Sequence, residues 1–278
     1  MSQRETLSAA AQFGVDFARE KLSGAKLLAL TGAGISTDSG IPDYRGAGRV
    51  ARHPMTFDVF IGSPQAQQRY WARSFVGWNR IAAAEPNAGH MALAKAEASG
   101  QLQNIITQNV DRLHQKAGSQ NVIDLHGRLD TVRCLGCREL FTRAVIDELL
   151  TALNPDVSKD LSVEFTPDGD AEIEATATFQ IPSCPNCAGV LKPDVVFFGE
   201  AVPADKVELA MQLLDEADAL LVAGTSLAVN SGLRFARRAH KAGKPIVIVN
   251  IGATKADELA TAKIDASTSI ALERLFID

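Results

Sequence analysis

Four segments of this chain follow one pattern, in which a run of apolar, often β-branched residues ends abruptly in small or polar residues. They are residues 27–34 (LLALTGAG), 104–111 (NIITQNVD), 218–226 (DALLVAGTS) and 244–252 (KPIVIVNIG). Unbroken apolar runs are typical of strands that are covered on both faces, as in a parallel sheet with helices on either side. This pattern restricts the chain to an α/β fold more firmly than any other feature.

Helical patterns lie between these runs. Residues 63–85 begin with Ser63 as a candidate N-cap and end before a proline, and residues 87–100 begin with the candidate cap Asn87 and stop at Gly100. Strands that alternate with helices predict a Rossmann-like, doubly wound parallel sheet, whose ligands bind outside the carboxyl ends of the strands. We therefore expect the polar tails of all four runs at one edge.

The cysteines predict a metal site. Cys134 and Cys137 form one C-x-x-C pair, Cys184 and Cys187 form another, and the chain has no other cysteine. Two such pairs can complete one tetrahedral zinc site per chain. Because four thiolates leave no open position for substrate, this zinc is expected to be structural. Two redox dithiols or two disulfides are the alternatives, although cytosolic disulfides are uncommon.

The cysteine region interrupts the strand and helix rhythm and predicts a smaller, inserted zinc-binding domain. At 278 residues the chain is long enough for about two domains on a prior of roughly 150 residues each. We expect a large, discontinuous Rossmann-like domain formed by residues 1–48, 82–126 and 191–278. Residues 49–81 would be a helical insertion and residues 127–190 the zinc-binding insertion, both belonging to the small domain.

Composition excludes some classes of partner. The formal net charge is −5, whereas a protein whose main partner is a phosphate backbone is usually basic, so we expect no nucleic acid. No apolar run approaches the roughly 20 residues that cross a bilayer, so we expect no membrane partner. The first 22 residues have the pattern of an amphipathic helix and not of an export signal, which predicts a cytoplasmic protein.

Taken singly, the candidate site motifs are ambiguous. Gly32, Ala33 and Gly34 after a strand allow close approach to a pyrophosphate, but Thr37 stands where a dinucleotide loop has its third glycine. A tight turn without a ligand fits that fragment equally well. A lone histidine such as His126 is more often structural than catalytic.

Together, the motifs resemble those of the sirtuins, NAD-dependent protein lysine deacylases. GAGISTDSGIPDYRG, TQNVDRLHQKAG, DLHG, CLGC with CPNC, KPDVVFFGE, GTSLAV and VNIG occur in the family's order over almost the whole chain. Tyr44 after GIPD, with the RYWARSFVGW stretch, is most similar to the class II branch. The resemblance implies that the protein releases nicotinamide and O-acyl-ADP-ribose, with NAD as co-substrate and acylated-lysine proteins or peptides as partners.

The resemblance also implies roles for individual residues. The NAD-binding residues would be Gly32, Ala33, Gly34, Ile35, Ser36, Asp43, Tyr44, Arg45, Gln108, Asn109, Asp111, Gly224, Thr225, Ser226, Asn250, Ile251 and Thr268. For the last of these the match is poor, because Ser269 replaces the family's usual glycine. His126 and Asn109 would be catalytic. Loss of nicotinamide is chiefly a matter of positioning and exclusion of water, whereas the later attack of a ribose hydroxyl on the acyl carbon needs a base such as histidine.

Two segments are candidates for substrate recognition. Val196, Phe197, Phe198, Gly199 and Glu200 resemble the strip along which the acyl-lysine peptide adds as a strand, although one of the two phenylalanines is expected in the core. Tyr70 and Arg73 have the Tyr-x-x-Arg spacing that class III sirtuins use for acidic acyl groups; a solvated arginine beside a half-buried tyrosine is the alternative.

Three other functions compete with deacylation. They are transfer of ADP-ribose to protein, a catalytically silent NAD- or zinc-binding interaction module, and a dehydrogenase, which the missing third glycine disfavours.

Overall fold

The four apolar runs form the middle of one parallel sheet, as predicted. The computed structural model describes residues 7–44, 54–159, 166–171 and 176–277. In these ranges the sheet has the order β3-β2-β1-β7-β8-β9, and every neighbouring pair is parallel. The four predicted strands are β1 (Leu27–Thr31), β2 (Leu102–Thr107), β7 (Ala219–Ala223) and β8 (Ile246–Val249). The two edge strands, β3 (Val122–Asp124) and β9 (Ala262–Ile264), are too short to give a sequence pattern of their own.

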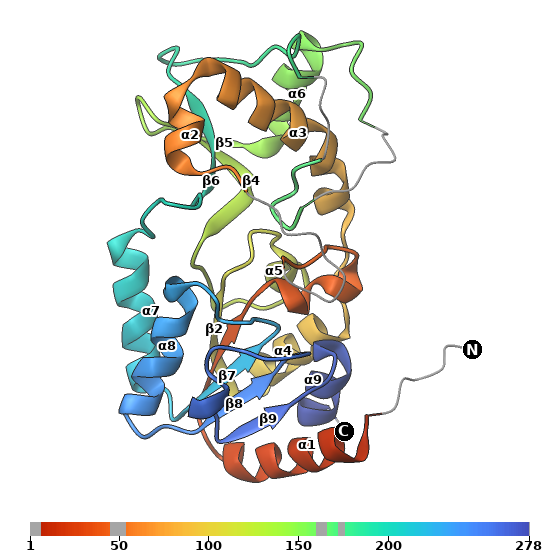
Figure 1. Ribbon diagram of the computed structural model, residues 1–278, viewed down its shortest axis with the longest axis vertical. Coiled ribbons are helices and arrows are strands. Elements are labelled where there is room, and N and C mark those ends of the chain that lie inside the picture. The colour runs from red at the N-terminus through yellow and green to blue at the C-terminus, as the bar shows by residue number, and fades with distance from the viewer. Residues whose placement is uncertain (1–6, 45–53, 160–165, 172–175, 278) are drawn as a thin grey trace, which may run out of the picture.

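Helices cover both faces of this sheet (Figure 1). Alternate side chains of β1 point to opposite faces: Leu27 and Ala29 belong to one apolar cluster, Leu28 and Leu30 to another. The first cluster includes residues of α1 (Ala9–Leu22), α4 (Ala88–Ala98) and α9 (Thr268–Phe276), and the second includes residues of α7 (Ala204–Glu216) and α8 (Asn230–Lys241). The fold is therefore a Rossmann-like, three-layer α/β arrangement.

The predicted helix starts are confirmed. Helix α3 (Pro64–Ala83) begins after Ser63, whose hydroxyl accepts a hydrogen bond from the Ala66 amide at 3.1 Å. Helix α4 begins after Asn87, whose side chain caps the first turn. Across the described ranges, every helix is too short or too polar to cross a lipid bilayer.

A second, smaller module stands beyond the carboxyl ends of the parallel strands (Figure 1). Its antiparallel sheet has the order β5-β4-β6, formed by β4 (Gly127–Cys134), β5 (Leu140–Thr142) and β6 (Leu191–Val195). Helices α2 (Phe57–Gly62), α3 and α6 (Arg143–Leu153) share one apolar cluster with this sheet. The indole Nε1 of Trp71 on α3 donates to the Leu191 carbonyl of β6 at 3.1 Å.

Both predicted insertions thus contribute side chains to one core. The domain boundaries at residues 49–81 and 127–190 stay a prediction. The chain returns from the small module to the large one through the segment after β6, and it passes between them at His126, just before β4. This arrangement puts the histidine at the junction of the two modules.

Candidate active site

A cavity of about 1340 Å³ lies between the two modules. The carboxyl ends of β1, β2, β7 and β8 form one wall, which is the edge that the sequence predicts for ligand binding. Of the residues that the resemblance assigns to NAD or substrate, those that line the cavity are Gly32, Ala33, Gly34, Ser36, Asp43, Tyr44, Tyr70, Gln108, Asn109, Asp111, His126, Val196, Phe197, Phe198, Gly199, Glu200, Gly224, Thr225, Ser226, Asn250, Ile251 and Thr268.

Two of the assigned residues that the structure describes do not line the cavity. Ile35 is fully buried and packs in the core of the parallel sheet. Arg73 lies on α3 outside the lining set, and Arg45 lies outside the described residues.

The glycine loop is held against the end of β7. Two short 3₁₀ turns, η1 (Ala33–Ile35) and η2 (Thr37–Ser39), follow β1 where a dinucleotide-binding dehydrogenase has a long helix. The Gly34 amide donates to the Gly224 carbonyl at 2.8 Å. A Cβ on Gly224, which has φ +64°, would lie 2.2 Å from the Ile35 amide nitrogen. Glycine therefore lets the two backbones touch and leaves an open cradle between them.

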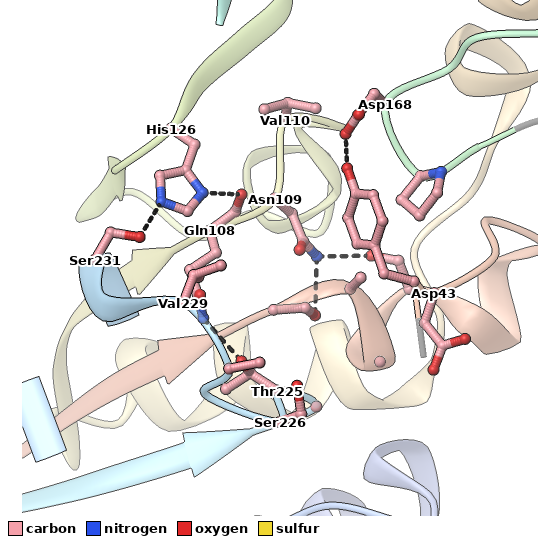
Figure 2. Close-up of a pocket in the computed structure, with 18 of the residues that line it drawn as sticks. Asp43, Gln108, Asn109, Val110, His126, Asp168, Thr225, Ser226, Val229 and Ser231 are labelled. Atoms are coloured by element: carbon pink, nitrogen blue, oxygen red, sulfur yellow. Dashed lines mark hydrogen bonds between the residues drawn. The ribbon is translucent and has the colours of Figure 1, made fainter. Parts of the chain in front are cut away.

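The polar residues after β2 tie these loops together. Gln108 Nε2 donates to the Thr225 hydroxyl at 3.0 Å, and Asn109 Nδ2 donates to the Gly32 carbonyl at 3.1 Å. Asp111 accepts from the Ser36 hydroxyl at 2.7 Å and from a backbone amide. Burial raises the pKa of Asp111 above its usual value, against the lowering effect of these hydrogen bonds. The same side chains that the resemblance assigns to the nicotinamide end therefore also build the wall there (Figure 2).

His126 is held in one tautomer. Its Nδ1 lies 3.1 Å from the Gln108 carbonyl oxygen, which can only accept, so Nδ1 carries the hydrogen. Nε2 then accepts from the Ser231 hydroxyl at 2.9 Å, and both residues line the cavity (Figure 2). Burial lowers the pKa of His126 most, the Gln108 hydrogen bond opposes this, and the charges of Lys206 and Arg234 add to the lowering. The imidazole is therefore neutral at pH 7, with its Nε2 lone pair facing the Ser231 hydroxyl.

The predicted substrate strip begins where β6 ends. The Val196 amide donates to the His126 carbonyl at 2.8 Å, which joins the strip directly to the histidine. Phe197 is buried in the small-module core and Phe198 is 40% exposed, so one phenylalanine is a core residue, as expected. Glu200 lines the cavity, but its carboxylate accepts from the Phe197 amide at 2.9 Å and pairs with Lys192 at 3.1 Å. In this structure the Glu200 carboxylate closes the strip's own turn.

The residues that the resemblance assigns to the adenosine end also line the cavity. Asn250 is buried, and its side-chain Nδ2 donates to the Ile251 carbonyl at 2.7 Å, while Ile251 is 72% exposed. Thr268 opens α9, and its hydroxyl donates to the Gly34 carbonyl at 3.4 Å. Thr268 thus lies beside the glycine loop even though Ser269 departs from the family's pattern.

A turn from the small module reaches the cavity as well. Asp168 accepts a hydrogen bond from the Tyr44 hydroxyl, and the Tyr44 ring meets Phe198 edge-on with 6.0 Å between ring centroids. Asp168 and Asp170 both line the cavity, and burial raises the pKa of Asp168 to about 7. Sequence reasoning missed these aspartates, for which the only signal is the turn-forming Pro-Asp-Gly-Asp string. It also missed Ser231, which carries no signal at all.

The four cysteines meet at one point of the small module. Their Sγ atoms lie within 4.8 Å of one another, with 3.4 Å between those of Cys134 and Cys187 and 3.7 Å between those of Cys137 and Cys184. Four thiolates at a Zn–S distance of about 2.3 Å are separated by about 3.8 Å, so the group fits one tetrahedral zinc ion. All four thiols are free, which argues against two disulfides.

The two knuckles share one backbone shape. In each, the residue after the second cysteine has a left-handed backbone, with φ 65° at Arg138 and 58° at Ala188. Its amide donates to the carbonyl of the first cysteine, at 3.0 Å in one knuckle and 2.8 Å in the other. Equivalent knuckles present their thiolates to a common centre, as a closed structural site requires.

Comparison with known proteins gives the family. The Sir2 family profile matches residues 32–231. A protein of Xanthomonas campestris pv. campestris (strain 8004) named NAD-dependent protein deacetylase is 54% identical over 251 residues, which cover 89% of this chain and 85% of that one. The NAD-dependent protein deacetylase 1 of Mycobacterium avium (strain 104) is 52% identical, with 89% of each chain covered.

Solved structures indicate the same family. A Sir2 structure with p53 peptide and NAD⁺ superposes with a TM-score of 0.75 at 32% identity, covering 94% of this chain and 95% of that one. A Sir2 protein bound to acetylated peptide gives a TM-score of 0.74 at 32% identity, covering 94% and 96%. The chain therefore belongs to the Sir2 family, the sirtuins, as its motifs predict.

Proposed function

We propose that this protein is an NAD-dependent protein-lysine deacylase that releases nicotinamide and O-acyl-ADP-ribose. The observation that carries the proposal is that one cavity brings a neutral, tautomer-fixed His126 beside both the glycine loop and the peptide strip. Relatives that are about half identical over most of the chain are named as deacetylases, and the Sir2 structures hold NAD⁺ or acetylated peptide.

In this proposal the large module binds NAD. The glycines and Ser226 hold the phosphates, Asn250, Ile251 and Thr268 surround the adenosine, and Gln108, Asn109 and Asp111 hold the nicotinamide end. When bound, NAD supplies a ribose carbon that becomes electrophilic as nicotinamide leaves. The task of the chain is to orient the acyl oxygen toward that carbon and to keep water out, which Asp43, Tyr44 and Phe198 assist from the cavity wall.

His126 then handles a proton. Its Nε2 lone pair can accept hydrogen from a ribose hydroxyl in place of Ser231, while Nδ1–H stays on the Gln108 carbonyl. The lowered pKa keeps the imidazole in its basic form near pH 7. Asn109 positions the reacting groups through its contacts with Gly32 and Ser36 and transfers no proton.

The metal has no part in this chemistry. The zinc ion would be held by Cys134, Cys137, Cys184 and Cys187. These four thiolates close its coordination sphere, so its role would be to stabilise the small module. Thiolates reserved for zinc suit a reducing compartment, so a cytoplasmic location belongs to the same proposal, as does membership of the class II branch. Cell fractionation tests the location.

The test is to incubate purified protein with NAD and an acetyl-lysine peptide and to identify both products by mass. Deacetylation that consumes NAD one for one supports the proposal. If NAD consumption needs no acylated lysine and ADP-ribose appears on unmodified protein, the protein is an ADP-ribosyltransferase. NAD binding without any nicotinamide release indicates the silent binding module.

A further inference from the structure

Three polar side chains lie in the core behind the loops that build the cavity wall. Thr31 and Thr107 end the neighbouring strands β1 and β2, and His114 lies on the short helix α5 (Leu113–Lys116). They are 0%, 3% and 1% exposed, and none of them lines the cavity. Burying a polar group costs free energy unless it is hydrogen-bonded, so polar groups at such positions indicate a specific set of partners.

These side chains form one continuous chain of hydrogen bonds. Thr31 and Thr107 lie opposite each other in the parallel strand pair, and the Thr31 hydroxyl donates to the Thr107 hydroxyl at 2.9 Å. His114 Nε2 lies 2.8 Å from the Thr31 hydroxyl oxygen. Because the one hydrogen of the Thr31 hydroxyl is directed to Thr107, Thr31 accepts from His114, and Nε2 carries the imidazole hydrogen.

The chain of hydrogen bonds ends at Asn109. The Asn109 backbone amide donates to the Thr107 hydroxyl at 3.1 Å. On the cavity side, Asn109 Nδ2 donates to the Gly32 carbonyl and to the Ser36 hydroxyl, each at 3.1 Å (Figure 2). The Thr107 hydroxyl therefore fixes the backbone from which the Asn109 side chain reaches into the site.

His114 also closes the loop that carries Gln108, Asn109 and Asp111. This loop leaves the sheet at Thr107, and the Asp111 carboxylate accepts from the Leu113 amide at 3.0 Å, where α5 begins. The next residue is His114, whose imidazole bonds back to Thr31 beside the point where the loop started. One pair of threonines thus holds both ends of the loop.

The imidazole of His114 is fixed and neutral. The ring of the fully buried His90 meets it edge-on, with 4.9 Å between ring centroids. Burial lowers the pKa of His114 well below its usual value, and the charge of His90 adds to the lowering. Nδ1 has no hydrogen-bond partner among the described residues, so a second hydrogen on the ring would be unsatisfied. His114 is therefore a donor of one hydrogen bond and carries no charge.

We propose that His114 is a positioning residue that, through Thr31 and Thr107, holds Asn109 in the orientation that receives the nicotinamide end of NAD. The inference rests on the proposed function. Buried networks of satisfied hydrogen bonds keep their members in one geometry, and a displacement of about 1 Å in a positioning group can cost about 100-fold in rate. A histidine that only fills space could be replaced by any side chain of similar size.

The experiment compares variants that remove the Nε2 donor with one that restores it. His114→Phe keeps a ring without a donor, whereas His114→Gln places an amide N–H near the position of Nε2. Thr31→Val interrupts the same chain with a smaller change of shape. Val15→Ala is the control, a buried change on α1, none of whose residues lines the cavity.

Release of nicotinamide is measured with NAD and an acetyl-lysine peptide at a temperature where the variants are folded. We expect His114→Phe and Thr31→Val each to lower kcat by about tenfold, and the double variant to be no worse than either, with the KM of the peptide unchanged. His114→Gln should recover most of the lost kcat, and Val15→Ala should lose stability but not kcat. If His114→Phe does not fold, Thr31→Val decides.

Calorimetric titration gives a measurement that is independent of turnover. ADP-ribose lacks nicotinamide, so the ratio of the Kd of NAD to the Kd of ADP-ribose isolates the nicotinamide end of the site. We expect this ratio to rise by about fivefold in His114→Phe and Thr31→Val, as the loss of one hydrogen bond predicts, and to stay unchanged in Val15→Ala.

A kcat in His114→Gln as low as that of His114→Phe would overturn the inference, as would a Thr31→Val protein with unaltered kcat and Kd ratio. If the unmodified protein turns over no acyl-lysine peptide but Thr31→Val still raises the Kd ratio, the proposed function fails and the positioning role stands. If the unmodified protein removes acetyl and neither measurement responds to Thr31→Val, only the positioning role fails.

Discussion

Replacing His126 by alanine should separate the two halves of the proposed reaction. Loss of nicotinamide depends on how NAD and the acyl oxygen are oriented, and His126 contributes no proton to it. Attack of the ribose hydroxyl needs a base, and a positioned base is worth about 10²–10⁴-fold in rate. We therefore expect His126→Ala to lower formation of deacylated peptide by at least about 100-fold while exchange of nicotinamide into NAD continues.

The structure supplies a graded companion to this variant. Ser231 donates one neutral hydrogen bond to His126 Nε2 at 2.9 Å, and one such bond contributes about 1 kcal/mol, or roughly fivefold. Because this bond is given up when a ribose hydroxyl takes the Nε2 lone pair, Ser231→Ala should change deacylation by no more than about fivefold, far less than His126→Ala. The two activities are measured on the same acetyl-lysine peptide, one with labelled nicotinamide and the other by peptide mass. If His126→Ala abolishes both activities equally, the histidine acts in binding and the proposed base role is wrong.

The pH profile tests the same residue. Because burial lowers the pKa of His126 below its ordinary value of about 6.5, its basic form dominates at pH 7, and deacylation should fall only on acidification below that value. Lys206 and Arg234 contribute to the lowering, so Arg234→Gln should move the acidic limb to higher pH. A limb that stays in place or moves to lower pH would contradict this electrostatic account.

Three further outcomes are expected. Cys137→Ser or chelation should release one zinc ion per chain and change the fluorescence of Trp71, which hydrogen-bonds to β6 of the zinc module; intact fluorescence in the metal-free protein would contradict a structural metal. Gly224→Ala should cost about 2 kcal/mol or more in unfolding free energy beyond Gly243→Ala, since both glycines have positive φ but only Gly224 faces a backbone clash; equal costs would refute the interlocked loops. Burial lowers the pKa of His90 to about 4, so the contribution of neutral His90 to the free energy of unfolding is fully present above pH 6.5 and falls by about 2 kcal/mol at pH 5. If the free energy of unfolding depends on pH in the same way in His90→Gln, this explanation is wrong.

Local signals predicted the scaffold well. Unbroken apolar runs identified the four inner strands, Ser63 and Asn87 marked helix starts, and the paired C-x-x-C motifs predicted one site from four thiols. Each of these features is set by a few neighbouring residues, through periodicity, capping or knuckle geometry. The three-residue edge strands escaped prediction because so short a segment has no period to detect.

The site was predicted only as far as its motifs extend. Gln108, Asn109 and His126 sit in distinctive strings, and the structure brings them to one wall. Ser231 and Asp170 belong to elements that approach the cavity only after the two modules pack together. Their positions depend on tertiary contacts such as the Ala171–Arg73 hydrogen bond, which no local pattern encodes.

Glu200, Ile35 and Arg73 show where a motif match stops being informative. Each occupies its predicted place in the chain, yet the Glu200 carboxylate closes its own turn, Ile35 packs into the core, and Arg73 lies outside the cavity lining. A motif fixes the backbone path, because glycines, caps and strand ends tolerate few substitutes, but the direction of a long side chain follows from its nearest charge or apolar neighbour. Backbone cradles such as that of Gly34 and Gly224 can therefore be transferred between relatives with little risk, whereas acyl-chain preference, which depends on a few side-chain atoms at the far wall, has to be established in each chain.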